Sequence, residues 1–206
     1  MTHDVLVFDP PTHTYRINNR VVPSVTQVIR EILAPDEYGG VPLHVLDHAA
    51  KRGRAVERMI ELDLGAELDP DSLRPELLPY WRAWQAFPDR AAWQDDPEWR
   101  SQGLVFSSAR GYAGTYDLYL PSCEALVDIK ATAQVPRTVG VQTAAYAGAM
   151  ALDDLDKLHT GVVLKRYCLH VTPSGCRLIP LTDKSDSADF LAALRVYNYR
   201  RNHHDA

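Results

Sequence analysis

Residues Gly111–Met150 read GYAGTYDLYLPSCEALVDIKATAQVPRTVGVQTAAYAGAM, and the strongest secondary-structure signals of the chain lie in this segment. Within it, Tyr112–Leu120 alternates aromatic or aliphatic residues with small or polar ones, as β-strands do. The turn signal Pro121–Glu124 follows, and Leu126–Lys130 resumes as a second strand. The sequence therefore predicts a hairpin whose strands lie about 4.8 Å apart.

Two acids and a lysine share one face of this predicted hairpin. Asp117 lies on the first strand, and Asp128 and Lys130 lie two residues apart on the second, so that these two project from the same face. Asp128 sits inside the apolar run Ala125–Ile129, where an unpaired carboxylate is costly to bury. Mg²⁺ is usually held by one or two carboxylates together with substrate phosphates. We therefore expect a divalent cation beside a phosphodiester here, the alternative being surface turn acids and a solvent-facing lysine.

An alanine-rich helix is predicted over Val139–Leu152, directly after the hairpin. Gln142 and Tyr146 are four residues apart and therefore lie on one face of it. That face can look onto the hairpin that carries the acids. The plain alternative for both residues is ordinary packing of a helix face.

The order and spacing of these residues resemble the PD-(D/E)XK nuclease superfamily. The resemblance rests on Gly114-Thr-Tyr-Asp117, Asp128-Ile-Lys130 and Gln142-x-x-x-Tyr146. It is closer to the branch that holds the RecB nuclease domain and lambda-type exonucleases, which phages often carry, and Pro23-Ser-Val-Thr-Gln27 is similar to the N-terminus of small phage-type members. Each piece alone is weak, because D-x-K occurs by chance in many chains, whereas all three in order are a strong signal. The resemblance covers most of the chain, and its middle third is the specific part.

The resemblance implies a metal site and a set of acting side chains. Asp117, Asp128 and the backbone carbonyl of Ile129 would hold one Mg²⁺ or Mn²⁺ ion, which polarises a phosphoryl oxygen and activates a water. Lys130 would position that water or stabilise charge in the transition state. The two remaining residues of the motif, Gln142 and Tyr146, would contact the phosphate backbone or fix the lysine. Little base specificity is expected, because backbone contacts carry no sequence information.

Glu57 is the last candidate for the metal site. It lies on a predicted long helix, Leu43–Leu64, which has Gly53 in its middle at a cost of about 1 kcal/mol relative to Ala. We expect a close packing contact at Gly53 to explain that cost. Relatives often read RG-x-A-V-H where Arg52–Glu57 reads RGRAVE, so a glutamate replaces their histidine. We expect Glu57 to ligate the cation directly or through water, the alternative being an exposed acid paired with a nearby arginine.

The complete chain is predicted to be a single nuclease domain, residues 1–206, with an N-terminal hairpin and helix at 1–34 and the nuclease core at 42–206. The order of elements favours the α/β class, with a central mixed β-sheet flanked by helices as in restriction endonucleases and an N-terminal β-hairpin ahead of it. The other predicted strands are Val5–Phe8, Tyr15–Ile17, Arg20–Val22, Glu98–Ser107, Thr160–Leu164, Tyr167–Val171 and Arg177–Leu181. The other predicted helices are Val25–Leu33 after the cap Ser24, Pro75–Phe87, and one from the cap Ser185 or Ser187 to about Arg200.

Composition limits the compartment and the cofactors. The 206 residues are 46% hydrophobic and 24% charged, with no apolar run near the ~20 residues of a membrane span and no signal-peptide pattern at the start. We therefore expect a cytoplasmic protein that does not enter a membrane. The three scattered cysteines, Cys123, Cys168 and Cys176, cannot supply the four-cysteine iron–sulfur cluster that some relatives carry, so none is expected.

The expected function is that of a divalent-metal-dependent deoxyribonuclease, most simply an exonuclease that acts on single- or double-stranded DNA ends in phage or bacterial recombination or repair, with a recombination protein as a further partner. A net charge of −5 argues against a broad basic surface for DNA but not against a nuclease, because several acids would sit at the metal. Two alternatives stay open: a structure-specific endonuclease on the same site, and a catalytically silent DNA-binding subunit.

Overall fold

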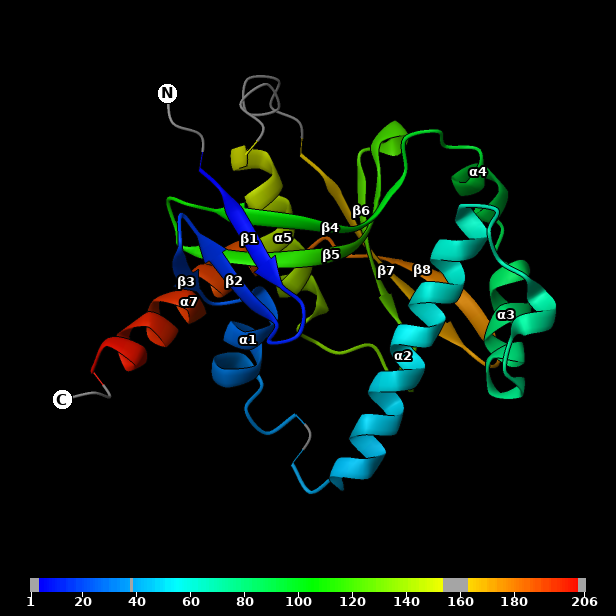
Figure 1. The fold of residues 1–206 in the computed structure, drawn as a ribbon, viewed down its shortest axis with the longest axis horizontal. Coiled ribbons are helices and arrows are strands. Elements are labelled where there is room, and N and C mark those ends of the chain that lie inside the picture. Colours follow the sequence, from blue (N-terminus) through cyan, green and yellow to red (C-terminus); the bar gives the residue numbers. More distant parts are fainter. Residues whose placement is uncertain (1–3, 38, 154–162, 204–206) are drawn as a thin grey trace.

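The computed structural model describes residues 4–37, 39–153 and 163–203, and a five-stranded mixed sheet lies at its centre (Figure 1). The strands are β4 (Arg100–Ser107), β5 (Tyr112–Leu120), β6 (Ala125–Lys130), β7 (Lys165–Thr172) and β8 (Gly175–Pro180). They stand side by side in this order, and each pair is antiparallel except β6–β7, which is parallel. The predicted α/β class with a central mixed sheet is confirmed.

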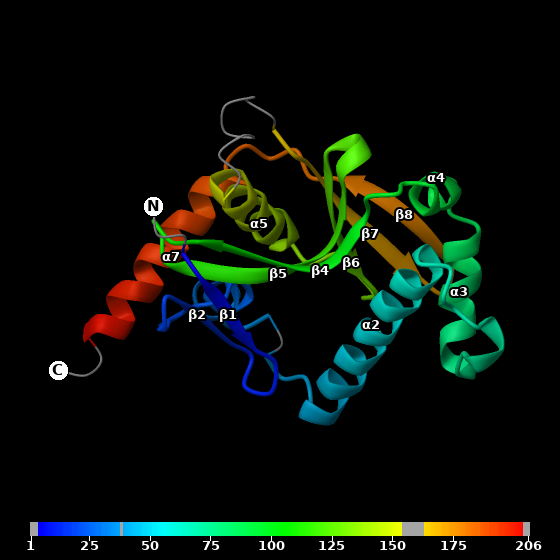
Figure 2. The same ribbon diagram turned by 45° about the horizontal axis from the view of Figure 1, so that its top comes forward.

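Helices cover both faces of this sheet, as the two views agree (Figures 1 and 2). One face carries α2 and α3, whose apolar side chains share a core with β5, β6 and β7. The other face carries α1, α5 and α7, which share a second core with β4, β5 and β6. The helices are α1 (Val25–Val28), α2 (Leu43–Leu64), α3 (Leu78–Gln85), α4 (Arg90–Gln94), α5 (Val139–Asp153) and α7 (Asp186–His203). Shorter turns are η1 (π-helical, Ile29–Leu33), η2 (Pro70–Ser72), η3 (Pro75–Leu77) and η4 (Pro121–Cys123).

Strand β6 explains why the sequence around it is so apolar. It is the middle strand of the sheet, and Ala125–Ile129 is buried throughout. Val127 packs in the core beneath α2 and α3, whereas Leu126 packs in the core beneath α5 and α7. A strand buried on both faces reads as a continuous apolar run, and so the charge of Asp128 stands out within it.

The N-terminal segment forms a small antiparallel sheet that docks on β5. Its strands are β1 (Leu6–Asp9), β2 (Thr14–Ile17) and β3 (Arg20–Val22), in the order β1-β2-β3. Its apolar face packs against Ala113 of β5. The Tyr15 hydroxyl lies 2.8 Å from the hydroxyl of Thr115, and the Ala113 N–H donates to the Pro23 carbonyl at 3.1 Å. The predicted hairpin of Tyr15–Ile17 with Arg20–Val22 is therefore present as β2 and β3, and the predicted strand Val5–Phe8, observed as β1, pairs with β2.

Two predictions about helices are wrong in instructive ways. The single helix predicted over Val25–Leu33 starts at the Ser24 cap, whose hydroxyl accepts the N–H of Gln27 at 3.0 Å, but it widens into the π-helical turn η1 after Val28. The close contact predicted at Gly53 is absent, because a Cβ added there would meet nothing within 4 Å among the described residues.

Several predicted boundaries also shift. The predicted helix Pro75–Phe87 begins as the 3₁₀ turn η3 and becomes α-helical at Leu78. The predicted strand Glu98–Ser107 starts at Arg100 instead. Most of the predicted strand Thr160–Leu164 lies outside the described residues, and Val163 and Leu164 are not in a strand. The last helix begins at Asp186, after Ser185 rather than Ser187. Across the described part of the chain, no helix has both the length and the apolar character to cross a membrane.

Candidate active site

The ladder between β5 and β6 stops short of the predicted acids. Its last backbone pair is Leu118 with Val127, and the next opposed residues are Asp117 and Asp128. In the opening, the Asp117 carboxylate accepts the N–H of Ile129 at 2.8 Å, where a strand partner would otherwise accept it. The N–H and the carbonyl of a strand residue point to the same side, so the Ile129 carbonyl faces this opening as well.

Asp128 and Lys130 form an ion pair within this opening. Their side chains come from the same face of β6, and the Lys130 ammonium lies 2.6 Å from one Asp128 oxygen. Asp128 is only 2% exposed, yet neither of its carboxylate oxygens has a well-aligned hydrogen bond from any described residue. Lys130 offsets part of the cost of burying this carboxylate, and the hydrogen bonds that water would supply are not replaced by described residues. The chain therefore holds a negative group that can still accept a ligand.

The pKa shifts follow from this crowding. Burial raises the pKa of Asp117 well above its usual range, the charge of Asp128 raises it further, and Lys130 opposes both. Burial also raises the pKa of Asp128, again opposed by Lys130. Burial by itself would lower the pKa of Lys130, but the charges of Asp128 and Asp117 outweigh it and the pKa is raised. One ammonium thus does not neutralise the two acids, and an additional cation would lower both carboxyl pKa values.

Glu57 approaches the same cluster from α2. Burial raises its pKa, Lys130 lowers it, and Asp128 raises it, so its charge is felt at the site. Among the described residues, no three His, Cys, Asp or Glu side chains are arranged to hold a metal ion together. The donors present, two aspartates and a main-chain carbonyl, fit a hard cation that takes its other ligands from phosphate and water. Direct ligation by Glu57 stays a prediction.

Gln142 and Tyr146 face the hairpin from α5. The Gln142 amide donates to the Tyr146 hydroxyl at 3.2 Å. Tyr146 is 3% exposed; burial raises its pKa, and the charges of Asp117 and Asp128 add to the rise. Its ring lies so close to β5 that a Cβ added at Gly114 would come within 2.5 Å of it. The glycine in the motif therefore has a steric purpose, since it lets the ring lie against the strand.

Sequence reasoning missed two residues that β7 contributes. Cys168 is opposite Asp128 and His170 is opposite Lys130 in the parallel ladder. Cys168 is fully buried, and burial raises its pKa to about 12, with the charge of Asp128 adding to the effect. The His170 Nε2 lies 2.8 Å from the carbonyl oxygen of Thr132. Because a carbonyl only accepts, Nε2 carries the ring N–H and donates it to Thr132, which holds the loop after β6. No local sequence signal identifies them, because the strand that lies beside β6 is set by the topology.

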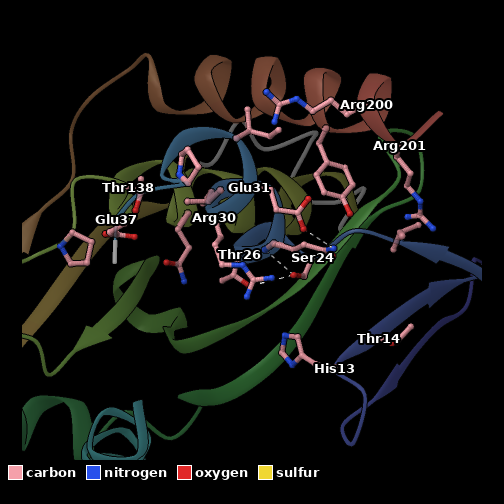
Figure 3. A pocket seen from close by; sticks show the side chains of 18 of the residues that line it. His13, Thr14, Ser24, Thr26, Arg30, Glu31, Glu37, Thr138, Arg200 and Arg201 are labelled. Carbon is pink, nitrogen blue, oxygen red and sulfur yellow. Dashed lines mark hydrogen bonds between the residues drawn. The ribbon is translucent and has the colours of Figure 1, made fainter. Parts of the chain in front are cut away.

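Lys130 and Gln142 line a groove with a volume of about 1470 Å³, part of whose lining is shown in Figure 3. The groove passes η1 and reaches the end of α7, where Arg200 and Arg201 line it. Lys130 can therefore be reached from solvent. The arrangement brings together a carboxylate pair, a cationic side chain and an amide donor, the groups that hydrolysis of a phosphate ester requires.

Comparisons with known proteins give no family. No protein-family model and no curated protein matches this sequence. Among solved structures, a protein of Eubacterium rectale described as a "putative exonuclease" aligns with a TM-score of 0.49 and 14% identity, over 72% of this chain and 65% of that one. The structure of SSO0001 aligns with a TM-score of 0.38 and 11% identity, over 75% of this chain and 72% of that one. Likeness at this level carries no conclusion about the chemistry of the site.

Proposed function

We propose that this chain is a divalent-metal-dependent nuclease that hydrolyses phosphodiester bonds of DNA. The observation that carries the proposal is the opening between β5 and β6. There, Asp117 and Asp128 face each other, Asp128 has no well-aligned hydrogen bond from any described residue, and Lys130 lies 2.6 Å from it. A strand pair has no structural use for two such acids, since an apolar pair would be cheaper to bury.

The residues that would hold the cation are Asp117, Asp128 and the Ile129 carbonyl, with Glu57 acting through a water. Mg²⁺ or Mn²⁺ bound there would supply Lewis-acid stabilisation of the phosphate and lower the pKa of an attacking water. The hydrogen bond from the Ile129 N–H to one Asp117 oxygen supports this assignment, because it fixes the orientation of the carboxylate. The other ligands would be phosphate oxygens and waters, as is usual for Mg²⁺.

The raised pKa values of Lys130 and Tyr146 indicate what each side chain would do in the reaction. The raised pKa of Lys130 keeps it an ammonium at physiological pH, so it serves as a donor and a positive charge, not as a base. The raised pKa of Tyr146 likewise keeps its hydroxyl protonated. Tyr146 accepts from Gln142, and no described residue accepts the Tyr146 proton, so that proton would be available to the phosphate. Lys130 and Gln142 both line the groove, from which they would meet the negative oxygens of the phosphate.

We propose further that cleavage starts at a DNA end. The support for this part is the likeness of the three motifs to the exonuclease branch. An endonuclease on the same site, or a silent DNA-binding subunit, would carry the same fold. These alternatives are separated by the form of DNA that is cut.

The test uses end-labelled linear duplex and covalently closed circles, each with Mg²⁺ or Mn²⁺. We expect the linear DNA to shorten from its ends, the circles to persist, and EDTA to abolish the reaction. Asp117→Ala should be inactive, whereas the control Asp71→Asn, an exposed acid on η2, should match the parent. Linearised circles would establish the endonuclease, and DNA binding without cleavage in either metal would establish the silent subunit.

A further inference from the structure

The groove is lined by more than the reacting groups. Besides Lys130 and Gln142, its lining includes Arg200 and Arg201 on the last turn of α7. Figure 3 shows part of this lining: Thr138 and Glu37 lie on one side, Arg30 and Thr26 lie in the middle, and Arg201 lies on the opposite side. A site for a single phosphate would not need a volume of about 1470 Å³.

Three arginines of the groove have no carboxylate partner within the described part of the chain. Arg30, Arg200 and Arg201 are exposed, and none of them has an ion pair with another described residue. The lining acids are Glu31 and Glu37, and Glu31 already accepts the Gln27 amide at 3.2 Å. The three arginines outnumber the two glutamates, so this lining carries a net positive charge on a chain whose net charge is −5. Such a positive lining attracts a polyanion.

The uncharged lining suits the backbone of that polyanion. Hydroxyl groups of Thr26 and Thr138 and the amide of Gln142 lie along the groove among the arginines. Arginine, hydroxyl and amide groups are the usual partners of phosphate oxygens in nucleic-acid complexes. The structural alternative for Arg200 and Arg201 is favourable contact with the negative end of α7, which would require no ligand.

We propose that this groove binds the phosphate backbone of a DNA strand on one side of the cleaved bond, with Arg30, Arg200 and Arg201 contacting phosphates remote from it. The inference rests on the proposed function, since it places the scissile phosphate at Lys130. It adds that strand length decides affinity. Oligonucleotides too short to reach from Lys130 to α7 bind without help from the arginines.

Binding is measured by fluorescence anisotropy with labelled oligothymidylates of about 2 to about 20 nucleotides, which bracket the usual site sizes of about 4–16. The proteins compared are the parent, Arg30→Ala, the double variant Arg200→Ala/Arg201→Ala, and the control Arg195→Ala, which is exposed on α7 but does not line the groove. We expect the first two variants to bind the long oligonucleotides roughly tenfold more weakly. Each lost contact should also reduce the slope of log K against log salt by about 0.7.

The shortest oligonucleotide should not distinguish the variants from Arg195→Ala, and neither should thermal melting. Double-stranded oligonucleotides of the same lengths are measured in parallel. Whichever of the single-stranded and double-stranded forms binds more tightly must bind more weakly to the arginine variants. If the double variant and Arg30→Ala match Arg195→Ala in affinity and salt slope at every length, the groove proposal is overturned, and the arginines only stabilise α7.

Hydrolysis of bis(p-nitrophenyl) phosphate separates this result from the proposed function. This small ester reaches Lys130 but not α7, so the arginine variants should cleave it at the parent rate while losing DNA affinity. If the parent cleaves neither the ester nor DNA, the catalytic proposal fails. The dependence of DNA affinity on Arg30, Arg200 and Arg201 still decides whether the groove is the binding path.

Discussion

Two buried aspartates of this protein differ in how many hydrogen bonds their carboxylates accept. Asp63 on α2 is 6% exposed and accepts hydrogen bonds from Trp84 at 2.8 Å and, through both oxygens, from Arg90 at 2.7 Å. Asp128 is 2% exposed and has the Lys130 ammonium beside it, but no well-aligned hydrogen bond from the described residues. Full support marks a carboxylate that holds the fold together. A buried carboxylate without that support calls for an explanation, and the explanation that we propose for Asp128 is a bound cation.

The supported aspartate fixes one side of the molecule. Arg90, which belongs to α4, also lies 5.6 Å from the ring centre of Trp81 on α3. Asp63 therefore ties α2 to both following helices. Glu57 lies on the same helix and extends toward the other aspartate, so α2 links the structural acid to the candidate site.

The largest effect is expected from Asp128→Asn. This change keeps the shape of the side chain but removes the charge that would bind the cation. DNA hydrolysis should fall by at least about 10³-fold, whereas the circular dichroism spectrum and the melting temperature should stay near those of the parent. Activity within tenfold of the parent would show that Asp128 resembles Asp63 after all.

Asp63→Ala should have the opposite result. Removal of the acceptor leaves the Trp84 N–H buried without its partner and the half-buried Arg90 guanidinium without its carboxylate. The free energy of unfolding in urea should fall by about 3–5 kcal/mol. Hydrolysis per folded molecule, measured well below the new melting temperature, should stay within about twofold. A selective loss of activity at full stability would contradict the division drawn between the two aspartates.

Glu57→Ala tests how far the candidate site extends. If Glu57 assists the cation through water, DNA hydrolysis in low Mg²⁺ should fall about 10- to 100-fold, and added Mn²⁺ should restore part of it. Glu57→His should shift the preference from Mg²⁺ toward Mn²⁺, because an imidazole nitrogen suits the softer ion. The control is Glu76→Ala, which removes an exposed acid of η3. Parent-like cleavage by Glu57→Ala in low Mg²⁺ would make Glu57 an ordinary helix acid.

The pH dependence of stability tests whether the acids of the candidate site, unlike Asp63, cost the fold stability when they are charged. Burial and the charge of Asp128 raise the folded-state pKa of Asp117 above its unfolded value of about 3.9. The folded state therefore holds the proton more tightly, and this acid costs stability as pH rises from about 4 through its folded pKa. In EDTA, Asp117→Asn keeps an acceptor for the Ile129 N–H without the charge. Its melting temperature should exceed that of the parent, by a margin that widens with pH; a constant margin would show that charge is not the cause.

The smallest effect is expected from Gly53→Ala. A Cβ at this position meets nothing within 4 Å in the described chain, and the residue is in the interior of α2. Alanine should raise the free energy of unfolding by about 0.5–1 kcal/mol. Neither aspartate is touched, so DNA hydrolysis should not change. A loss of stability would mean that α2 needs its glycine for a partner that approaches there.

The sequence predictions succeeded where a structural feature is determined by residues close together in the chain. The bounds of Leu43–Leu64 and Tyr112–Leu120 were predictable, because a long apolar period and a strong alternation leave few alternatives. Asp117 and Asp128 meet because a short turn brings neighbouring strands into register, which is also a local effect. The prediction at Gly53 failed because an intrinsic cost in a helix does not require a compensating contact.

What the sequence did not reveal depends on elements far apart in the chain. The support of Asp63 comes from α3 and α4, whose placement no local pattern sets, although an acid three residues after Ile60 on the buried face of α2 was a usable signal. Cys168 and His170 reach the site only because β7 lies beside β6. The charged groove needs η1 and the end of α7 to converge, and this is a property of the whole fold.

The contact between Gly114 and Tyr146 constrains how this chain can change over generations. A methyl group at Gly114 would lie 2.5 Å from a ring carbon of Tyr146, so a larger residue is barred while the ring is present. Replacing Tyr146 by phenylalanine keeps the ring and the barrier. A shorter side chain at Tyr146 must therefore arise before Gly114 is free to vary, and the reverse order passes through a clash. The order of the two substitutions is therefore fixed: the buried Tyr146 hydroxyl is lost before β5 can gain a side chain at Gly114.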